Sequence, residues 1–324
     1  MDRRIILAEV ARMYYKEKLT QSEISSHVGL SRSQVSRMLQ EAEDLGIARI
    51  EVVDIRSRND ELEKSLVDKL GLAEARVVYV LSPAESVIRK NLARYAAQFI
   101  VEMVNEGDII GVTSGQTLGE TARFLRNEHQ LRISIVQLMG GLNYFSVQSN
   151  PDMVVRDFTE ALRGNLCTLH APLIVENNEV RRVIMSTTSV SNTVKMWGKL
   201  SSIVMGIGSP SKDNYLVQNK WFTVTDMADI IKAHAVGVIC GQFYDICGDA
   251  VRSKADDRLI AAPLPLFRKV KRTVAIAGGN SKISAIIGAI HGGYCNTLIT
   301  DNYTAEHLLG AANNLNSGRS KLKV

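Results

Sequence analysis

The sequence predicts an α/β protein in which a small helical unit precedes a doubly wound, mostly parallel sheet. Three short amphipathic patterns fill residues 5–44, with no apolar stretch of strand length between them. From Ala75 onward, short apolar runs alternate with amphipathic helical patterns. Such near-continuous apolar strands are typical of parallel sheets that helices cover on both faces. A polar segment, Asp54–Asp60, lies between the helical region and the region of alternating strands and helices, so we expect domains at 1–55 and 56–324.

Composition sets few further limits. A length of 324 residues suits about two domains, and a net charge of +5 suits a polyanionic partner, although charge alone says little about partners. The four cysteines and six histidines show no metal-binding spacing, so we expect no metal site and no cofactor. No signal peptide or apolar run of membrane-spanning length is present, so we expect a cytoplasmic protein with no membrane partner.

The segment from Thr20 to Asp44 predicts two short helices joined by a tight turn. Thr20–Glu23 and Ser31–Gln34 both match the capping box, in which a hydroxyl caps the third amide and a Glu or Gln side chain reaches back. Gly29 lies between them, where a sharp turn tolerates a residue with no Cβ. With the helical pattern Ile5–Lys16 as support, this is the layout of a helix-turn-helix, whose second helix enters the major groove of DNA.

The outward positions of the second helix carry hydroxyls, an amide and guanidinium groups. Arginine can bind guanine bidentately, glutamine can bind adenine, and serine can reach base or phosphate. The residues expected to contact double-stranded operator DNA are Gln21, Ser31, Arg32, Ser33, Gln34, Ser36 and Arg37. The alternative is a surface helical hairpin that binds nothing, which the two capping boxes and the cationic face disfavour.

The alternating run Ile47–Val53 predicts a strand after the second helix, and therefore a winged helix-turn-helix. Arg49 within that strand is either a phosphate contact or an ordinary surface residue. The next helical pattern, Asn59–Leu70, carries leucines at 62, 66 and 70. This helix either packs on its own domain or forms a dimer seam, and three leucines do not decide between the two.

The second domain has a regular alternation of elements. The strands are expected at Arg76–Leu81, Asp108–Thr113, Ile133–Leu138, Leu166–Leu173, Ser202–Ile207, Thr273–Ala277 and Asn296–Thr300. The helices are expected at Glu85–Asn105, Thr117–Arg126, Pro151–Arg163, Asn178–Met185, Val190–Lys199, Val224–Ala235, Lys282–His291 and Thr304–Ala312. Two short apolar pieces within Val236–Arg258 predict a local hairpin or insertion.

Glycine-rich turns follow four of these strands, at Ser114–Thr117, Met139–Gly141, Gly206–Ser209 and Gly278–Lys282. In an open α/β sheet, ligands lie beyond the carboxyl ends of the strands. A Gly and hydroxyl turn that opens a helix exposes backbone N–H groups to an anion. Each turn alone only permits a sharp bend, and none matches a P-loop or a dinucleotide fingerprint, so nucleotide binding is not indicated.

The whole chain resembles the SorC-type sugar-responsive transcriptional regulators. The resemblance is carried, in order, by LTQSEISSHVGLSRSQVSRML, GDIIGVTSGQT, VQLMGGL, VMGIGSP, FYDICGD, AIAGGNSKISAIIGAIHGGY and LITDNYTAEHLL. It implies a helix-turn-helix joined to an effector domain that is similar to sugar-phosphate isomerases and deaminases. It also implies a phosphorylated sugar or polyol as the effector, and a homodimer or homotetramer.

The resemblance also implies roles for single residues. Phosphate would be held by Ser114, Gly115, Gln116, Thr117 and Lys282, and the sugar would be bordered by Gly140, Gly141, Gly206, Gly208 and Asp245. Two positions depart from the family pattern. Val238 stands where members often have an Asp that accepts sugar hydroxyls, and Met139 stands where deoxyribose-phosphate-responsive members have a Lys. Since methionine cannot form a Schiff base, the effector is not expected to be held covalently.

The expected function is transcriptional regulation of a carbohydrate-utilisation operon, and not catalysis. The alternative is a sugar-phosphate isomerase or deaminase with an appended DNA module, which needs a positioned acid and base. Asp245 and His291 are the available candidates, although Asp245 could simply cap a turn and His291 could simply end a helix. In a third reading the chain is a binding module without an effector, and the glycine-rich loops are only turns.

Overall fold

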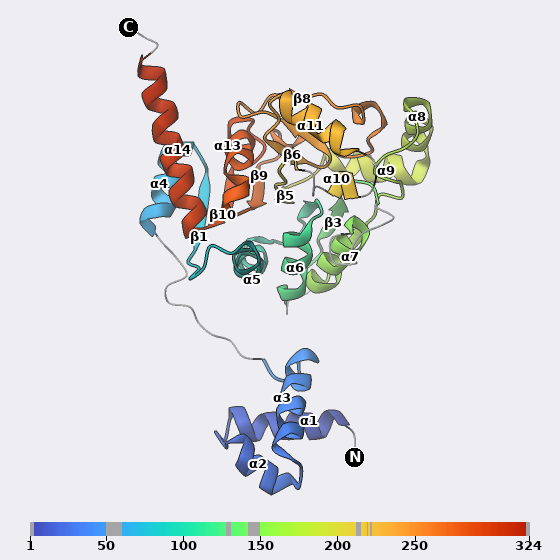
Figure 1. Cartoon of the computed structure of the whole chain (residues 1–324). Coiled ribbons are helices and arrows are strands. Elements are labelled where there is room, and N and C mark those ends of the chain that lie inside the picture. Colours follow the sequence, from blue (N-terminus) through green and yellow to red (C-terminus); the bar gives the residue numbers. More distant parts are fainter. Residues whose placement is uncertain are drawn as a thin grey trace. The chain divides into compact units, whose positions relative to one another are not determined.

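The computed structural model describes residues 3–49, 60–127, 131–141, 150–211, 215–218, 220 and 222–321, with side chains as far as Ala312. Its contacts divide the chain into two compact units, Met1–Ile55 and Arg56–Val324 (Figure 1). Each unit has its own hydrophobic core and is described here by itself.

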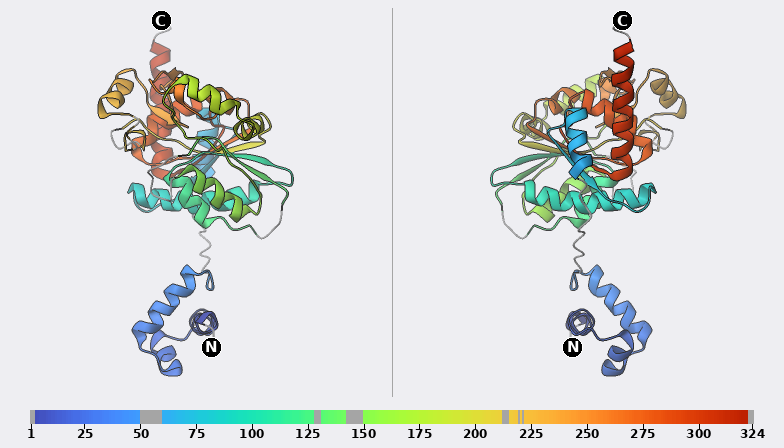
Figure 2. Two further views of the ribbon diagram at one scale, coloured as in Figure 1. Left: turned by 90° about the vertical axis from the view of Figure 1, so that its right-hand side faces the viewer. Right: turned by 90° about the vertical axis from the view of Figure 1, so that its left-hand side faces the viewer.

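The N-terminal unit consists of three helices, α1 (Arg3–Tyr15), α2 (Gln21–Val28) and α3 (Arg32–Asp44), shown in blue in Figure 2. Its core is formed by Leu7, Val10, Ile24, Val35, Leu39 and their neighbours. Both expected capping boxes are present, at Thr20 for α2 and at Ser31 for α3. Gly29 ends α2 in the left-handed conformation, at φ 67°, which explains why glycine occupies the turn.

The expected strand Ile47–Val53 lies mostly outside the described residues. In the described part, residues 47 and 48 form a bend and residue 49 has no regular structure, so no strand is present there. The wing therefore stays a prediction.

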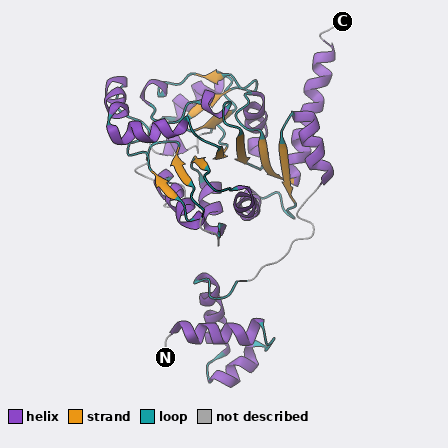
Figure 3. Cartoon of the chain, turned by 180° about the vertical axis from the view of Figure 1, so that it is seen from behind, coloured by secondary structure: helices purple, strands orange, loops and turns teal. Residues whose placement is uncertain are grey.

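The second unit is built on a seven-stranded sheet in the order β1-β10-β9-β5-β2-β3-β4, with every neighbouring pair parallel. The strands are β1 (Glu74–Val78), β2 (Ile109–Val112), β3 (Ser134–Gln137), β4 (Asn165–Cys167), β5 (Ser202–Gly206), β9 (Arg272–Ile276) and β10 (Thr297–Asp301). Each corresponds to one expected strand, so the predicted α/β fold with a parallel sheet is confirmed. Figure 3 shows the strands in orange between layers of helix.

Helices cover both faces of this sheet, as a doubly wound fold requires. One apolar core lies under α5 (Glu85–Met103), α6 (Gln116–Phe124) and α7 (Pro151–Leu162). The opposite core includes residues of α4 (Asp60–Leu70), α9 (Thr188–Trp197), α11 (Val224–Lys232), α13 (Ile283–His291) and α14 (Asn302–Lys321). The remaining described helices are α8 (Asn178–Ser186) and the short α10 (Tyr215–Gln218) and α12 (Leu264–Phe267), with 3₁₀ turns at Asp256–Arg258 and Asn280–Lys282.

The expected local hairpin is confirmed as a small antiparallel sheet of β6 (Gly237–Ile239), β7 (Gln242–Tyr244) and β8 (Ala250–Val251). It is joined to the end of β5 by a bridge between Gly208 and Val238. The predicted strand Leu166–Leu173 is too long, because β4 ends at Cys167. Residues beyond it turn to pair with the segment after β3, through a bridge between Gly141 and Pro172.

The leucine-bearing helix α4 packs on its own domain. Leu66 is fully buried, and Leu62 and Leu70 pack partly against the same core. Figure 2 shows α4 beside α14, and the two helices are in contact. A dimer seam through Leu66 is therefore wrong. Among the described residues, no helix is both long and apolar enough to cross a membrane.

Candidate DNA-binding and effector sites

The residues of α3 divide cleanly between core and solvent. Val35 and Leu39 face the core of the N-terminal unit. The six candidates on this side of the turn are all exposed: Ser31, Arg32, Ser33, Gln34, Ser36 and Arg37. The second helix thus presents a polar, cationic surface of the kind that can read a DNA groove.

The capping box of α3 already uses two of these candidates. The Ser31 N–H donates to Gln34 Oε1 at 2.8 Å, and the Gln34 N–H donates to Ser31 Oγ at 3.3 Å. Adenine recognition by glutamine needs both its carbonyl and its amide nitrogen. In this conformation Gln34 cannot offer both, and the Ser33 hydroxyl lies 3.0 Å from Ser31 Oγ. Arg32, Ser36 and Arg37 are therefore the candidates on α3 that the capping box leaves unused.

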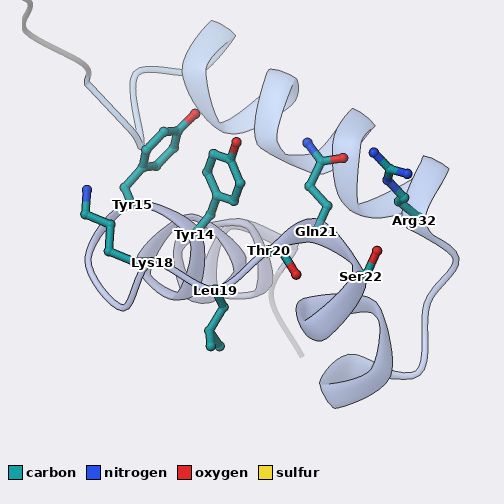
Figure 4. A pocket seen from close by; sticks show the side chains of 8 residues that line it. All are labelled: Tyr14, Tyr15, Lys18, Leu19, Thr20, Gln21, Ser22 and Arg32. Atoms are coloured by element: carbon teal, nitrogen blue, oxygen red, sulfur yellow. The ribbon is translucent and has the colours of Figure 1, made fainter.

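A hollow of about 530 Å³ lies beside the starts of α2 and α3 (Figure 4). Gln21 and Arg32 line it, together with three groups that the sequence analysis missed: Tyr14, Tyr15 and Lys18. Helix N-termini favour anions, and Arg32 and Lys18 add positive charge, so the hollow can accept a backbone phosphate. Lys18 could have been selected from the sequence, because it lies two residues before the Thr20 capping box that begins α2.

The acidic end of α3 is tied to α1. Arg3 donates two hydrogen bonds to the Glu41 carboxylate, at 2.8 and 2.6 Å, and the Tyr15 hydroxyl donates to Glu43. The Arg3 guanidinium lowers the pKa of Glu41, while burial and the Glu43 contact raise the pKa of Tyr15 to about 12. The Arg3 ion pair partly neutralises the Glu41 carboxylate in a helix that must approach a polyanion.

In the second unit, the strand order reverses between β2 and β5. From β2 the chain continues outward to β3 and β4, and then returns to place β5 on the other side of β2. Open α/β sheets bind ligands at such a reversal, beyond the carboxyl ends of the strands. Apart from Asp245, the expected effector residues lie at the carboxyl ends of β2, β3, β5 and β9 or in the segments that follow them, including the first turn of α6.

Ser114 is the point where three of these loops meet. Its hydroxyl donates to the Met139 sulfur at 3.1 Å. Its carbonyl oxygen faces Gly206, and a Cβ added to Gly206 would lie 3.6 Å from that oxygen. Thr113 Oγ1 accepts the Gly206 N–H at 3.2 Å and joins the loops after β2 and β5. Met139 is buried, so the Ser114 hydroxyl lies against a buried, apolar side chain.

The start of α6 follows Ser114 directly. Gly115 precedes the helix at φ 133°, a conformation that other residues rarely adopt, and contributes no side-chain cap. Gln116 is exposed and Thr117 is buried at the first turn. Because the first amides of a helix have no partner within it, this turn directs N–H donors toward the carboxyl edge of the sheet.

Lys282 lies in the loop after β9, immediately before α13. Its N–H donates to the Gly279 carbonyl at 3.0 Å, within the 3₁₀ turn Asn280–Lys282. Burial lowers the pKa of Lys282; Glu85 opposes this effect and Arg89 adds to it. Two strand spacings separate β9 from β2, which is about 10 Å. For one phosphate to contact both loops, the Lys282 side chain must reach across much of that distance toward α6.

The expected sugar-bordering glycines are fixed by the backbone around them. The N–H groups of Gly140, Gly141 and Gly208 donate to the carbonyls of Ile260, Ala171 and Val238, at 3.0, 2.8 and 3.0 Å. A Cβ on Gly140 would lie 2.5 Å from the backbone of Pro172, so only glycine fits there. These residues shape the loops, but their amides are not available to a sugar.

The family model described as a sugar-binding domain matches residues 56–310. The "Deoxyribonucleoside regulator" of Bacillus subtilis (strain 168) is 32% identical over 301 residues, covering 93% of this chain and 96% of that protein. The chain belongs to the SorC family of transcriptional regulators.

Other SorC-family relatives agree along the full length. The "Sorbitol operon regulator" of Klebsiella pneumoniae is 27% identical and covers 94% of this chain and 97% of that protein. The crystal structure of the full-length Sorbitol Operon Regulator SorC from Klebsiella pneumoniae has a TM-score of 0.75 at 26% identity, covering 95% of this chain and 99% of that one. These relatives are regulators, so the chain is a transcriptional regulator.

The two candidate acid–base residues have structural roles in this SorC-family chain. Asp245 Oδ1 accepts the N–H groups of Cys247 and Asp249, at 2.9 and 2.8 Å, and so caps a turn. His291 ends α13, and its Nδ1 lies 2.8 Å from the Ile246 carbonyl oxygen. The Asp245 backbone packs against Gly288, in the second half of α13, whereas Lys282 precedes that helix. Asp245 therefore lies away from Lys282 along the axis of α13.

A carboxylate that the sequence analysis did not select lies at the carboxyl edge. Asp152 Oδ1 accepts a hydrogen bond from Gln137 Nε2 at 2.7 Å, and its Oδ2 lies against Gly141. Gln137 is buried, and it also receives the Leu169 N–H, which fixes its orientation. Asp152 is exposed at the start of α7, where the sequence signalled only a helix start.

Proposed function

We propose that this regulator binds the operator of a carbohydrate-utilisation operon through α3 and the hollow beside it. A phosphorylated sugar or polyol, bound at the carboxyl edge of the large sheet, controls that binding. The names of the relatives support the effector class, since they include a deoxyribonucleoside regulator and a sorbitol operon regulator. A regulator that binds bacterial operators works in the cytoplasm, where the DNA is.

The observation that carries the effector proposal is the placement of two anion-binding elements at one edge of the sheet. The uncapped start of α6 supplies backbone donors, and the loop after β9 supplies Lys282. Positive charge is slightly unfavourable at the start of a helix, and a bound phosphate offsets this. Ser114, Gly115, Gln116 and Thr117 are the proposed phosphate contacts on the α6 side.

The proposed oligomer is at least a homodimer. A single helix-turn-helix makes few base contacts, so specific binding generally uses two copies on repeated half-sites. Since Leu66 is buried within its own domain, it does not form the contact between copies, which we place on the surface of the second unit.

A thermal-shift screen of the full chain tests the effector proposal. A ligand at a hundred times its dissociation constant stabilises the folded state by about 2.7 kcal/mol. We expect a phosphorylated sugar or polyol to raise the melting temperature, its unphosphorylated form to do so far less, and Lys282→Ala to abolish the difference. Lys269→Ala is the control, because it removes the same charge at an exposed position elsewhere in the second unit.

Equal shifts from the free and the phosphorylated compounds in the wild-type protein would contradict a phosphate site. If the phosphorylated compound acts equally on wild type and Lys282→Ala, a phosphate site at this loop is wrong. An effector that shifts the melting temperature without changing operator affinity would contradict the regulatory role.

A further inference from the structure

An exposed carboxylate of the chain itself, that of Glu85, lies against the loop that carries Lys282. Ser281 Oγ donates a hydrogen bond to Glu85 Oε1 at 2.6 Å, although the two residues are 196 positions apart. The Cγ atom of Glu85 is 3.5 Å from where a Cβ on Gly279 would lie, so the side chain rests against the glycine turn. Glu85 thus contacts the loop at two points.

Two cations share this neighbourhood. Burial lowers the pKa of Lys282, and the Glu85 carboxylate raises it. Arg89, one turn further along α5, lowers that pKa as well. Arg89 donates from Nε to Glu120 Oε1 of α6 at 2.7 Å. Around the loop, two carboxylates therefore balance the two cations when no effector is bound.

We propose that Glu85 competes with the effector's phosphate for Ser281 and Lys282. This inference rests on the proposed function, because it concerns the regulation of the same site. A phosphate that approaches Lys282 must displace a carboxylate of like charge from Ser281. The displacement weakens the binding of every anion by a similar factor.

The competing carboxylate sets a threshold, which is the affinity that an anion needs in order to occupy the site. Inorganic phosphate has only its charge to offer, so the competing carboxylate keeps it from occupying the site. A phosphorylated sugar adds contacts of its own and exceeds the threshold. Glu85 therefore lowers the affinity of the site for every anion, so that free phosphate alone does not fill it, and it leaves the ratio of the affinities unchanged.

A helix-stabilising role is the simpler alternative for Glu85. It lies in the first turn of α5, where negative charge interacts favourably with the helix dipole. That role needs a charge at this position, but no contact with Ser281. Glu85→Asp separates the two, because it keeps the charge in the first turn and shortens the side chain.

The test is a titration of the full chain with inorganic phosphate, in which calorimetry or thermal shift measures the affinity. We expect Glu85→Gln to bind phosphate about tenfold more tightly than wild type, since removing a nearby like charge changes the affinity for an ion by at least that factor. We expect Glu85→Asp to tighten phosphate binding by a smaller factor, because it keeps the charge but withdraws it from Ser281. Glu102→Gln is the matched control. It removes one charge from the same helix, 17 residues and about 25 Å away, at an exposed residue that accepts a hydrogen bond from Gln98.

The outcomes distinguish this inference from the proposed function. If phosphorylated sugars act through Lys282 but neither Glu85 variant tightens phosphate binding, the competition is wrong and the phosphate site stands. If Glu102→Gln tightens phosphate binding as much as Glu85→Gln does, the effect is one of net charge and the competition is again wrong. If no phosphorylated compound acts on any variant, the phosphate site fails, and the competition fails with it.

Discussion

At the start of α3, the side chains of Ser31 and Gln34 bind one another, and this changes which residues can read DNA. A glutamine that closes a capping box stabilises the helix, but it has one group fewer for a base. The two arginines are less constrained: Arg32 lines the hollow near the helix start, and Arg37 is exposed more than one turn further on. Their positions imply different roles, since phosphate contacts fix the protein on the duplex and base contacts give specificity.

Substitution of each arginine by alanine tests this division. We expect Arg32→Ala to weaken binding to all duplexes alike and to reduce the salt slope by about 1, as the loss of a phosphate contact does. We expect Arg37→Ala to cost about 1–3 kcal/mol on the operator and to relax specificity at one base pair. Affinities for operator and random duplexes at several salt concentrations give both quantities.

Lys269→Ala again serves as the charge control, because Lys269 belongs to the second unit. Wild-type affinity in both arginine variants would show that α3 does not contact DNA. A uniform loss in both would show that neither arginine reads a base.

Among the elements, α4 shows that a leucine pattern can predict a helix without indicating what the helix packs against. Three leucines at heptad-like spacing fit a coiled-coil seam as well as a packed surface helix. The structure decides between them, because Leu66 is fully buried among residues of its own domain.

Leu66→Ala should therefore act on stability and leave assembly unchanged. We expect the free energy of unfolding of the second unit to fall by about 2–5 kcal/mol, the usual cost of a cavity in a packed core. Leu81→Ala is the control, since Leu81 is 86% exposed and should cost little. Denaturant unfolding measures the first effect and light scattering the second; a loss of oligomers at unchanged stability would overturn the packing argument.

Sequence periodicity predicted the seven sheet strands because parallel strands are apolar over their whole length. It missed α10 and α12, since four residues do not complete enough of a helical pattern to be recognised. The end of β4 and the strand order were not predictable, because they depend on contacts far apart in the chain, such as that between Gly141 and Pro172.

The same distinction holds for the candidate sites. Local motifs indicated the turn Ser114–Thr117 and the position of Lys282. They could not reveal that the amides of Gly140 and Gly141 are used within the fold, or that Glu85 reaches Ser281. Those facts need the three-dimensional arrangement.

For the whole molecule, two units with separate cores imply two separable activities. The N-terminal core shares no residue with the two cores of the second unit. A polar segment joins the units in the sequence. Effector binding and the proposed contact between copies should both be properties of the second unit.

A shortened chain that begins at residue 56 tests this. We expect it to keep the melting-temperature rise with phosphorylated compounds, to remain at least dimeric by light scattering, and to lose operator binding. If it is strictly monomeric, and the full chain is also monomeric on DNA, the proposed oligomer is wrong. Loss of the effector response in a folded shortened chain would mean that the N-terminal unit contributes to the effector site.

The pairing of β1 with β10 has a consequence for how the protein is made. Glu74 pairs with Thr297, so the first strand of the sheet waits for its neighbour until 223 further residues have been synthesised. At about 5–20 residues per second, the delay is roughly 11–45 s on the ribosome. During that time the apolar face of α4 and β1 has no sheet to join. We therefore expect the nascent chain to depend on chaperones until the last strand emerges.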